Sequence, residues 1–199
     1  MAARFMPKLN QIEFEALVAR VRAGDQEAAT ELVRVYEPEI RREVRLRLTS
    51  AQLRRTLDSV DICQSVFGRF FIKAALGELE FDHPQQLLRL LCQMARNKVI
   101  DRYRRDQVRR PDDGEEIPIE GAVNPRATTE TPSQIIQREE LITRVSALLT
   151  SQEREIAAMR RNGETWSVIA QQVGGTAESV RKTLSRTCER VIDELGIDS

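Results

Sequence analysis

Apolar positions recur at the spacing of an amphipathic helix along most of the first hundred residues. A first helix is expected to end at Gly24, and Asp25 is a suitable N-cap for a second. The second pattern runs through Pro38, where a kink or a split into two helices is expected. Further helices are predicted from about Asp58, and from the residue after Pro84 to about residue 107.

The periodicity stops between Val108 and Ser133, a stretch that contains four prolines, two glycines and mostly acidic charge. Such a stretch predicts an extended connector between two domains. Its composition fits a mere flexible tether equally well. If this stretch is an extended connector, we expect the helical parts on its two sides to move independently.

Helical periodicity resumes at Gln134, and the next boundaries carry clear capping signals. Residues 150–153 (TSQE) form a capping box, and Asn162-Gly163 ends the helix that follows. A short helix over 166–173 capped by Thr165, a Gly174-Gly175 turn and a final helix capped by Thr176 and running to about Leu195 predict a helix-turn-helix. The expected fold is all-α, with two small helical domains (1–107 and 134–199) joined by an acidic linker (108–133) and the second a helix-turn-helix.

Composition argues against several classes of protein. The single histidine and three widely spaced cysteines provide no zinc site, disulfide framework or Ser-His or Cys-His triad. There is no glycine-rich phosphate loop and no paired set of carboxylates, so an enzyme has little support and neither a metal nor a cofactor is expected. The N-terminus lacks the apolar segment of a secretory signal, and no apolar run is long enough to span a membrane. We therefore expect a cytoplasmic protein without membrane contact.

The formal net charge is zero, with 31 basic and 31 acidic residues, but the charges are segregated. Residues 96–110 carry a net +5, and residues 111–140 carry a net −6. Two such neighbouring blocks create strong local fields in a chain that is neutral overall. Binding to nucleic acid thus remains open despite the neutral total.

The start of the final helix has the composition of a recognition helix, in which the first turns reach base edges and basic residues hold phosphates. An ordinary helical hairpin with a solvated face is the alternative. Trp166, at the start of the preceding helix, is expected to be a core anchor rather than a base-stacking residue. The candidate duplex-binding residues are Thr176, Ser179, Arg181, Lys182, Ser185 and Arg186.

The helix after Pro84 changes from apolar to basic and ends in the segment ARNKVIDRYRR. Asn97, Asp101, Arg104 and Arg105 fall on one strip, and an aromatic residue lies beside it. Basic residues with an aromatic can follow a nucleic-acid backbone and stack on an unpaired base. A solvated face with an Asp101–Arg105 pair is the plainer alternative. The candidate residues for single-strand binding are Asn97, Lys98, Asp101, Arg102, Tyr103, Arg104 and Arg105.

The helix over residues 57–71 combines an apolar face with a narrower polar strip. Cys63 lies with the apolar set and is expected to be buried and inert. Asp61, Gln64, Ser65 and Gly68 form the polar strip, which suggests a protein contact, although simple exposure would also explain it.

Three segments together resemble bacterial sigma factors of the extracytoplasmic-function (ECF) group. DICQSVF is similar to the group's D-L-x-Q-E-V-F motif, and ARNKVIDRYRR to its A-R-N-x-x-x-D-x-x-R-R segment. The end of the chain resembles the group's last domain, with L-x-x-x-x-R-E, I-A-x-x-x-G and V-x-x-x-L-S-R in order. The three matches keep the family's order, and they cover nearly the whole chain.

The resemblance implies a role for each segment. Asp61, Gln64 and Ser65 would dock on the clamp helices of core RNA polymerase. The helix carrying Asn97 to Arg105 would bind and help melt the promoter minus-10 element on the non-template single strand. Thr176 to Arg186 would read the minus-35 duplex, and the linker would pass through the polymerase. Members of the group are often held by an anti-sigma factor, which is a further candidate partner.

Two positions depart from the family pattern. Ser65 replaces the glutamate that follows the glutamine, which removes one charge from the polymerase contact. Gly175 replaces an apolar turn residue, so the final helix is expected to sit slightly differently. A helix-turn-helix repressor or activator, acting as a dimer without polymerase docking, is the alternative function.

Overall fold

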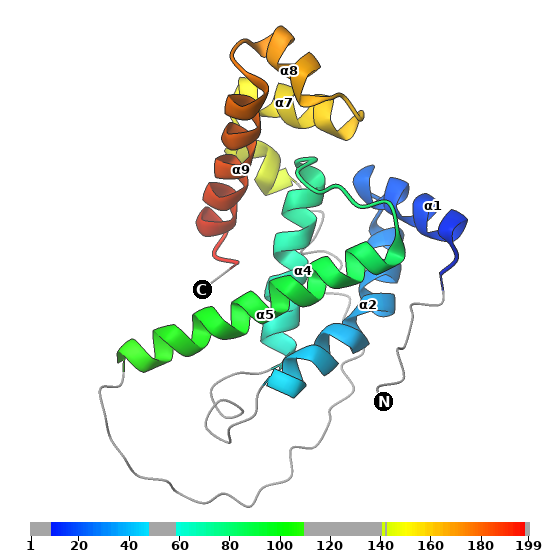
Figure 1. Cartoon of the computed structure of the whole chain (residues 1–199), viewed down its shortest axis with the longest axis vertical. Coiled ribbons are helices and arrows are strands. Elements are labelled where there is room, and N and C mark those ends of the chain that lie inside the picture. Colours follow the sequence, from blue (N-terminus) through cyan, green and yellow to red (C-terminus); the bar gives the residue numbers. More distant parts are fainter. Residues whose placement is uncertain (1–8, 48–58, 110–140, 142, 198–199) are drawn as a thin grey trace, which may run out of the picture.

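The computed structural model describes residues 9–47, 59–109, 141 and 143–197, and this part of the chain is helical without any strand (Figure 1). Leu141 and residues 143–148 are helical. The main helices are α1 (Gln11–Arg22), α2 (Gln26–Arg47), α4 (Ser59–Ala75), α5 (Pro84–Arg109), α7 (Ser151–Arg161), α8 (Trp166–Val173) and α9 (Ala177–Glu194). The all-α prediction is therefore confirmed for these residues.

The first four of these helices begin and end largely where the local sequence signals place them. Asn10 and Glu13 form a reciprocal capping box at the start of α1, with both N–O distances 2.9 Å. The Asp25 carboxylate accepts a hydrogen bond from the Ala28 amide at 3.0 Å, so Asp25 caps α2 as expected. Of the two outcomes expected at Pro38, a kink or a split, the split does not occur, because α2 runs unbroken through this residue. Tyr36 and Ile40, on either side of this proline, are fully buried and hold both halves of α2 against the core.

The N-terminal core lies between α1, α2, α4 and α5. Its fully buried members include Leu32, Phe70, Leu87 and Leu91, from three of these helices. The Tyr36 hydroxyl donates to the Pro84 carbonyl oxygen at 3.4 Å, which links α2 to the first residue of α5. Helix α5 continues to Arg109, two residues beyond the predicted end, so Val108 and Arg109 belong to this helix. The remainder of the predicted linker lies outside the described residues.

The C-terminal part consists of the segment around Val145 with α7, α8 and α9. Each of the three helices begins at the predicted cap, Thr150, Thr165 or Thr176, whose hydroxyl accepts a backbone N–H. A turn through Gly174 and Gly175 joins α8 to α9. The two helices pack through buried Ile169, Val180 and Leu184, which lie in one core.

The two parts of the chain touch each other, whereas we expected them to move independently. Ile72 of α4 and Leu76, the residue directly after this helix, are each 1% exposed, and they belong to the C-terminal core rather than to the N-terminal one. Positions two apart on a helix differ by about 200° and so face opposite sides. Phe70 and Ala74 therefore face the N-terminal core while Ile72 and Leu76 face the C-terminal part. Helix α4 lies between the two cores (Figure 1).

Candidate nucleic-acid and polymerase interfaces

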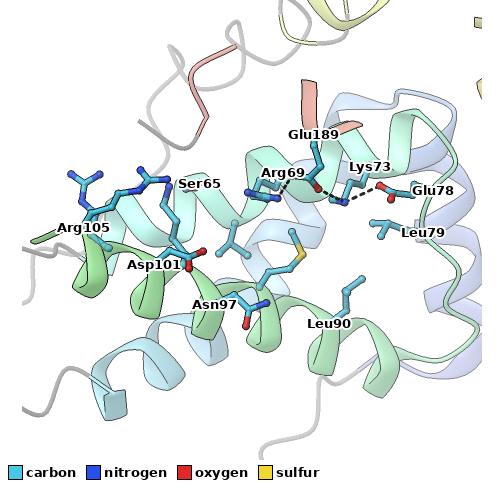
Figure 2. A pocket seen from close by; sticks show the side chains of 14 residues that line it. Ser65, Arg69, Lys73, Glu78, Leu79, Leu90, Asn97, Asp101, Arg105 and Glu189 are labelled. Atoms are coloured by element: carbon cyan, nitrogen blue, oxygen red, sulfur yellow. Dashed lines mark hydrogen bonds and ion pairs between the residues drawn. The ribbon is translucent and has the colours of Figure 1, made fainter. Parts of the chain in front are cut away.

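The basic half of α5 borders a cavity of about 390 Å³ between α4, α5 and α9. Asn97, Asp101 and Arg105 follow one another along the side of α5 that faces it, as Figure 2 shows. Lys98 and Arg102 line the same cavity. The structure thus brings together five of the seven residues predicted to bind a single strand.

Tyr103 and Arg104, the other two, do not line this cavity. Tyr103 is 44% exposed, and Arg104 is also exposed on the surface of α5. The Asn97 side-chain oxygen accepts a hydrogen bond from Gln93 at 2.8 Å, one turn earlier on the helix. An ion pair of 3.2 Å between Arg96 and Glu43 connects this half of α5 to α2. The basic end of the helix is therefore held on a folded scaffold.

The polar strip on α4 is narrower than predicted. Asp61 and Gln64 are exposed, as expected for a docking surface. Ser65 is only 9% exposed and lies on the cavity side of α4, so the expectation that it is exposed is wrong. Gly68 is half-buried, and a Cβ atom there would lie 3.0 Å from the Ile197 side chain. At Gly68 the C-terminal part of the chain is the cause, because Ile197 lies against this side of the helix, whereas Ser65 faces the cavity that the basic half of α5 borders.

The first turn of α9 uses its hydroxyl groups for capping. The Ser179 amide donates to the Thr176 hydroxyl at 3.1 Å, and the Thr176 amide donates to the Ser179 hydroxyl at 2.9 Å. The Ser179 hydroxyl also donates to the Thr176 carbonyl oxygen at 2.8 Å. In this structure both side chains fix the start of the helix.

The basic residues of α9 are more accessible. Arg181, Lys182 and Arg186 are exposed, and Ser185 is half-buried. Lys182 pairs with Glu178 at 2.7 Å, whereas Arg181 and Arg186 form no ion pair with any residue that the structure describes. These two guanidinium groups can therefore reach a phosphate or a base edge without first breaking a pair.

Trp166 is half-buried and packs against the C-terminal core, which agrees with its predicted role as an anchor. The Arg160 guanidinium lies over its indole ring, 4.2 Å from the ring centroid. Arg160 also forms an ion pair with Glu80, in the segment that follows α4. The indole thus has a packing role at the boundary between the two parts of the chain.

Glu153 connects α7 to α9, a role that sequence reasoning did not assign to it. Its carboxylate accepts hydrogen bonds from Thr187 at 2.7 Å and from Arg190 at 2.9 Å. Burial alone would raise the pKa of Glu153, but hydrogen bonds from Thr150, Thr187 and Arg190 outweigh it and lower the pKa to about 2. The capping box predicted its local role, whereas the link to α9 depends on tertiary packing.

Arg69, Lys73 and Glu189 were also missed by the sequence reasoning. The Glu189 carboxylate of α9 lies 2.6 Å from Arg69 and 3.0 Å from Lys73 of α4, and Lys73 also contacts Glu78 at 2.8 Å (Figure 2). Burial would lower the pKa of Lys73, but hydrogen bonds to the two glutamates raise it above its ordinary value. The only sequence signal for these ion pairs was the spacing of Arg69 and Lys73, two basic residues four positions apart on α4.

The remaining chemistry of the described residues is limited. No group of three His, Cys, Asp or Glu side chains in this part of the chain is arranged to hold a metal ion. Cys63 and Cys188 are buried, and burial raises the pKa of Cys92 to about 11, so this thiol stays protonated near neutral pH. Among the described helices, none is both long and apolar enough to cross a membrane.

Comparison with protein families identifies the class of this molecule. The family model described as ECF sigma factor matches residues 11–195, which extend from α1 through α9. The chain therefore belongs to the ECF sigma factor family, and its activity is that of a sigma factor in promoter-specific initiation by RNA polymerase. Sigma factors bind DNA and RNA polymerase and are not themselves enzymes. No curated protein and no solved structure matches the chain.

Proposed function

We propose that this sigma factor divides promoter recognition between its two helical parts and docks on polymerase through a third surface. Residues 1–107 would bind polymerase and the minus-10 element, and residues 134–199 would bind the minus-35 element. The observation that carries this division is the presence of accessible basic groups on two separate helices, α5 and α9.

The docking surface is assigned to Asp61 and Gln64, with Ser65 beside them. Asp61 and Gln64 are exposed on the side of α4 opposite the N-terminal core, so a partner can reach both without unfolding the helix. Surface substitutions of this kind change stability by within about 0.5 kcal/mol. Loss of polymerase binding on replacing either residue would therefore report the contact itself.

The minus-10 surface is assigned to the basic half of α5. Five cationic side chains lie there, at Lys98, Arg102, Arg104 and Arg105 together with Arg96. The half-exposed ring of Tyr103 can stack on an unpaired base, and such stacking contributes about 1–3 kcal/mol. This combination favours the unpaired non-template strand over a duplex, and it supports a role in melting.

The minus-35 surface is assigned to the start of α9. Arg181 and Arg186 supply two exposed guanidinium groups, which suit phosphates and guanine edges. Thr176 and Ser179 would contribute mainly by holding the helix start, and Lys182 would exchange Glu178 for a phosphate. The connector over residues 110–133 lies outside the described residues, and we assign it to the path through polymerase. An anti-sigma factor is a proposed partner because family members often have one.

The test separates duplex binding from promoter opening. Arg181→Ala should weaken binding to the upstream duplex and lower its salt slope by about one unit, because one phosphate contact is lost. Asn97→Ala should spare duplex binding and reduce transcription from a closed promoter, with recovery on a template that carries a mismatched bubble. Permanganate reactivity of unpaired thymines reports opening directly.

The matched control is Arg34→Ala, which removes an exposed arginine of α2 that belongs to none of these surfaces. It should leave duplex binding, opening and transcription unchanged. Normal opening by Asn97→Ala, or a defect of Arg181→Ala confined to opening, would show that the division of labour is wrong. Gln64→Ala with unchanged affinity for core polymerase would remove the docking assignment.

A further inference from the structure

One stripe of α5 changes from apolar to cationic along the wall of the cavity. Residues four apart lie on the same face of a helix, and four such residues of α5 line the cavity and are half-buried. In chain order they are Leu90, Met94, Lys98 and Arg102. At about 1.5 Å per residue, Leu90 and Lys98 lie about 12 Å apart along the helix axis. This wall of the cavity is therefore polarised, with an apolar end and a cationic end.

The other walls of the cavity continue this polarity. Figure 2 shows Leu79 and Leu90 at one end of the cavity, and Asp101 and Arg105 at the other. Leu79 belongs to the segment that joins α4 to α5, and Val66 adds apolar surface from α4 itself. Apolar side chains from two helices and from the segment between them can thus enclose an apolar group.

The cations that α4 contributes to the cavity are neutralised within the protein. Lys73 lies 2.8 Å from Glu78 and 3.0 Å from Glu189, and Glu189 also lies 2.6 Å from Arg69. These two cations and two carboxylates together carry no net charge. An anion entering the cavity would therefore gain little from Arg69 and Lys73.

The cations that α5 contributes outnumber the carboxylates beside them. Lys98, Arg102 and Arg105 line the cavity together with the carboxylate of Asp101, which gives this group of residues a net charge of +2. Arg102 is half-buried and forms no ion pair within the part of the chain that the structure describes. A guanidinium group can bind two phosphate oxygens at once through its fork of N–H donors. The cationic end of the cavity therefore suits a phosphate group.

The size of the cavity favours an organic phosphate over an inorganic ion. Its volume of about 390 Å³ lies within the range of small-molecule sites, about 300–1,000 Å³. A ligand that reaches both Lys98 and Leu90 must extend over about 12 Å, which is too far for a lone phosphate. Small-molecule sites commonly combine apolar walls with a few charged or polar groups that orient the ligand. The polarised cavity has this composition.

We propose that this cavity is a binding site for a small organic phosphate of about the size of a mononucleotide. Its phosphate would lie against Lys98, Arg102 and Arg105, and its apolar or aromatic body against Leu90 and Met94. A nucleoside monophosphate combines these two parts, a single phosphate and a flat base. Binding at this site requires only the cavity, so it is independent of the promoter functions proposed above.

Isothermal titration calorimetry with the full chain tests the site. The probes are AMP, GMP, CMP and UMP, each compared with its own nucleoside and with inorganic phosphate. At least one of the four nucleotides should bind with a Kd below about 1 mM. It should bind at least tenfold more tightly than its nucleoside and than inorganic phosphate. Absence of binding by all four overturns the proposal, and so does a nucleotide that binds no more tightly than inorganic phosphate or its nucleoside.

A charge variant shows whether the nucleotide occupies the cavity or the open surface of α5. Arg102→Gln should weaken nucleotide binding roughly tenfold, because a hydrogen bond to a charged group is lost. The matched control is Arg104→Gln, since Arg104 is exposed on the same helix and does not line the cavity. It should keep the affinity of the wild-type chain. Because Arg104 is assigned to the minus-10 surface, equal losses in the two variants would place the nucleotide on that surface and overturn the proposal.

A second variant fills the apolar end of the cavity and leaves every charge in place. Leu90→Trp should weaken nucleotide binding at least tenfold, because the indole ring would occupy the space assigned to the body of the ligand. The matched control is Ile100→Trp, since Ile100 is 40% exposed on α5 and does not line the cavity. Circular dichroism checks that both variants fold, and the arginine pair decides the question if Leu90→Trp does not. Wild-type affinity in a folded Leu90→Trp variant overturns the proposal.

Discussion

The two helical parts of this sigma factor differ in how they complete their cores. The N-terminal part buries only its own residues, with Leu32, Leu87 and Leu91 fully enclosed by α1, α2, α4 and α5. The C-terminal part is smaller, and its core includes Ile72 of α4 and Leu76 directly after α4, more than sixty residues earlier in the chain. A small domain buries a small fraction of its surface, so two borrowed side chains matter to it. The boundary between the two parts along the sequence therefore does not coincide with the boundary between the two hydrophobic cores.

The largest expected effect comes from truncating one leucine in each core. Leu87→Ala and Leu76→Ala each remove a fully buried side chain, which costs about 3 kcal/mol of unfolding free energy. Trp166, the single tryptophan, lies in the C-terminal part, so its fluorescence follows that part during urea unfolding while circular dichroism follows both. Leu76→Ala should shift the fluorescence transition to lower urea, and Leu87→Ala should shift mainly the circular dichroism signal.

The exposed Ile12, at 80% exposure, provides the control for both leucines. Ile12→Ala should change either transition by less than about 0.5 kcal/mol. A fluorescence transition that Leu76→Ala leaves in place would show that the C-terminal part does not depend on α4 in solution.

A smaller effect is expected for the carboxylate that joins α7 to α9. Glu153→Gln should cost about 2 kcal/mol at neutral pH, because hydrogen bonds to a charged carboxylate are lost. The pKa of Glu153 is lowered to about 2, so its contribution is complete above the ordinary glutamate value near 4.5 and is lost as the pH falls toward 2. Urea unfolding followed by Trp166 fluorescence between pH 5 and pH 2 measures this loss.

The free energy of unfolding of Glu153→Gln should change less than that of wild type over the same pH range. Glu155→Gln is the matched control, since Glu155 is exposed and accepts one hydrogen bond from Gln172 on α8. It should cost less than about 0.5 kcal/mol. Equal acid dependence in wild type and Glu153→Gln would show that this carboxylate does not stabilise the C-terminal part.

The smallest effect separates the two glycines between α8 and α9. Gly174 and Gly175 have φ values of +87° and +97°, so alanine is strained at both, and at Gly174, where ψ is 156°, the strain is about 1–3 kcal/mol. Only at Gly175 would the new Cβ also meet the Ser179 hydroxyl, at 2.9 Å. In thermal unfolding followed by Trp166 fluorescence, the loss on Gly175→Ala should therefore be about 1 kcal/mol smaller when Ser179 is also alanine, whereas the loss on Gly174→Ala should be the same in both backgrounds. An unchanged loss on Gly175→Ala would mean that the Thr176–Ser179 cap yields easily.

Features that depend on neighbouring residues were predicted well from the sequence. The capping groups Thr150, Thr165 and Thr176 fix the starts of three helices because their hydroxyls each accept a hydrogen bond from the amide three residues further on. The Gly174-Gly175 turn is likewise a local matter of backbone conformation. Pro38 does not split α2, because tertiary burial on both sides of it outweighs the loss of one backbone hydrogen bond.

Features that depend on distant residues were not predicted. Ser65 has the polarity of an exposed residue, and nothing near it in the sequence indicates that it lines a cavity between α4, α5 and α9. The ion pairs of Glu189 join residues that are more than a hundred positions apart. The candidate DNA-binding residues came from local charge and spacing, whereas the shared cavity that groups Asn97 with Glu189 required the packing of three helices.

The position of Ile72 and Leu76 has a consequence for how the protein folds while the ribosome is still synthesising it. The N-terminal helices emerge first and can fold before the residues that cover these two side chains have been made. About 115 further residues separate Leu76 from Ile192, so synthesis at about 5–20 residues per second leaves the pair uncovered for roughly ten seconds. During that interval the nascent chain presents a small apolar patch on α4, bordered by Arg69 and Lys73, on which chaperones or neighbouring nascent chains can act.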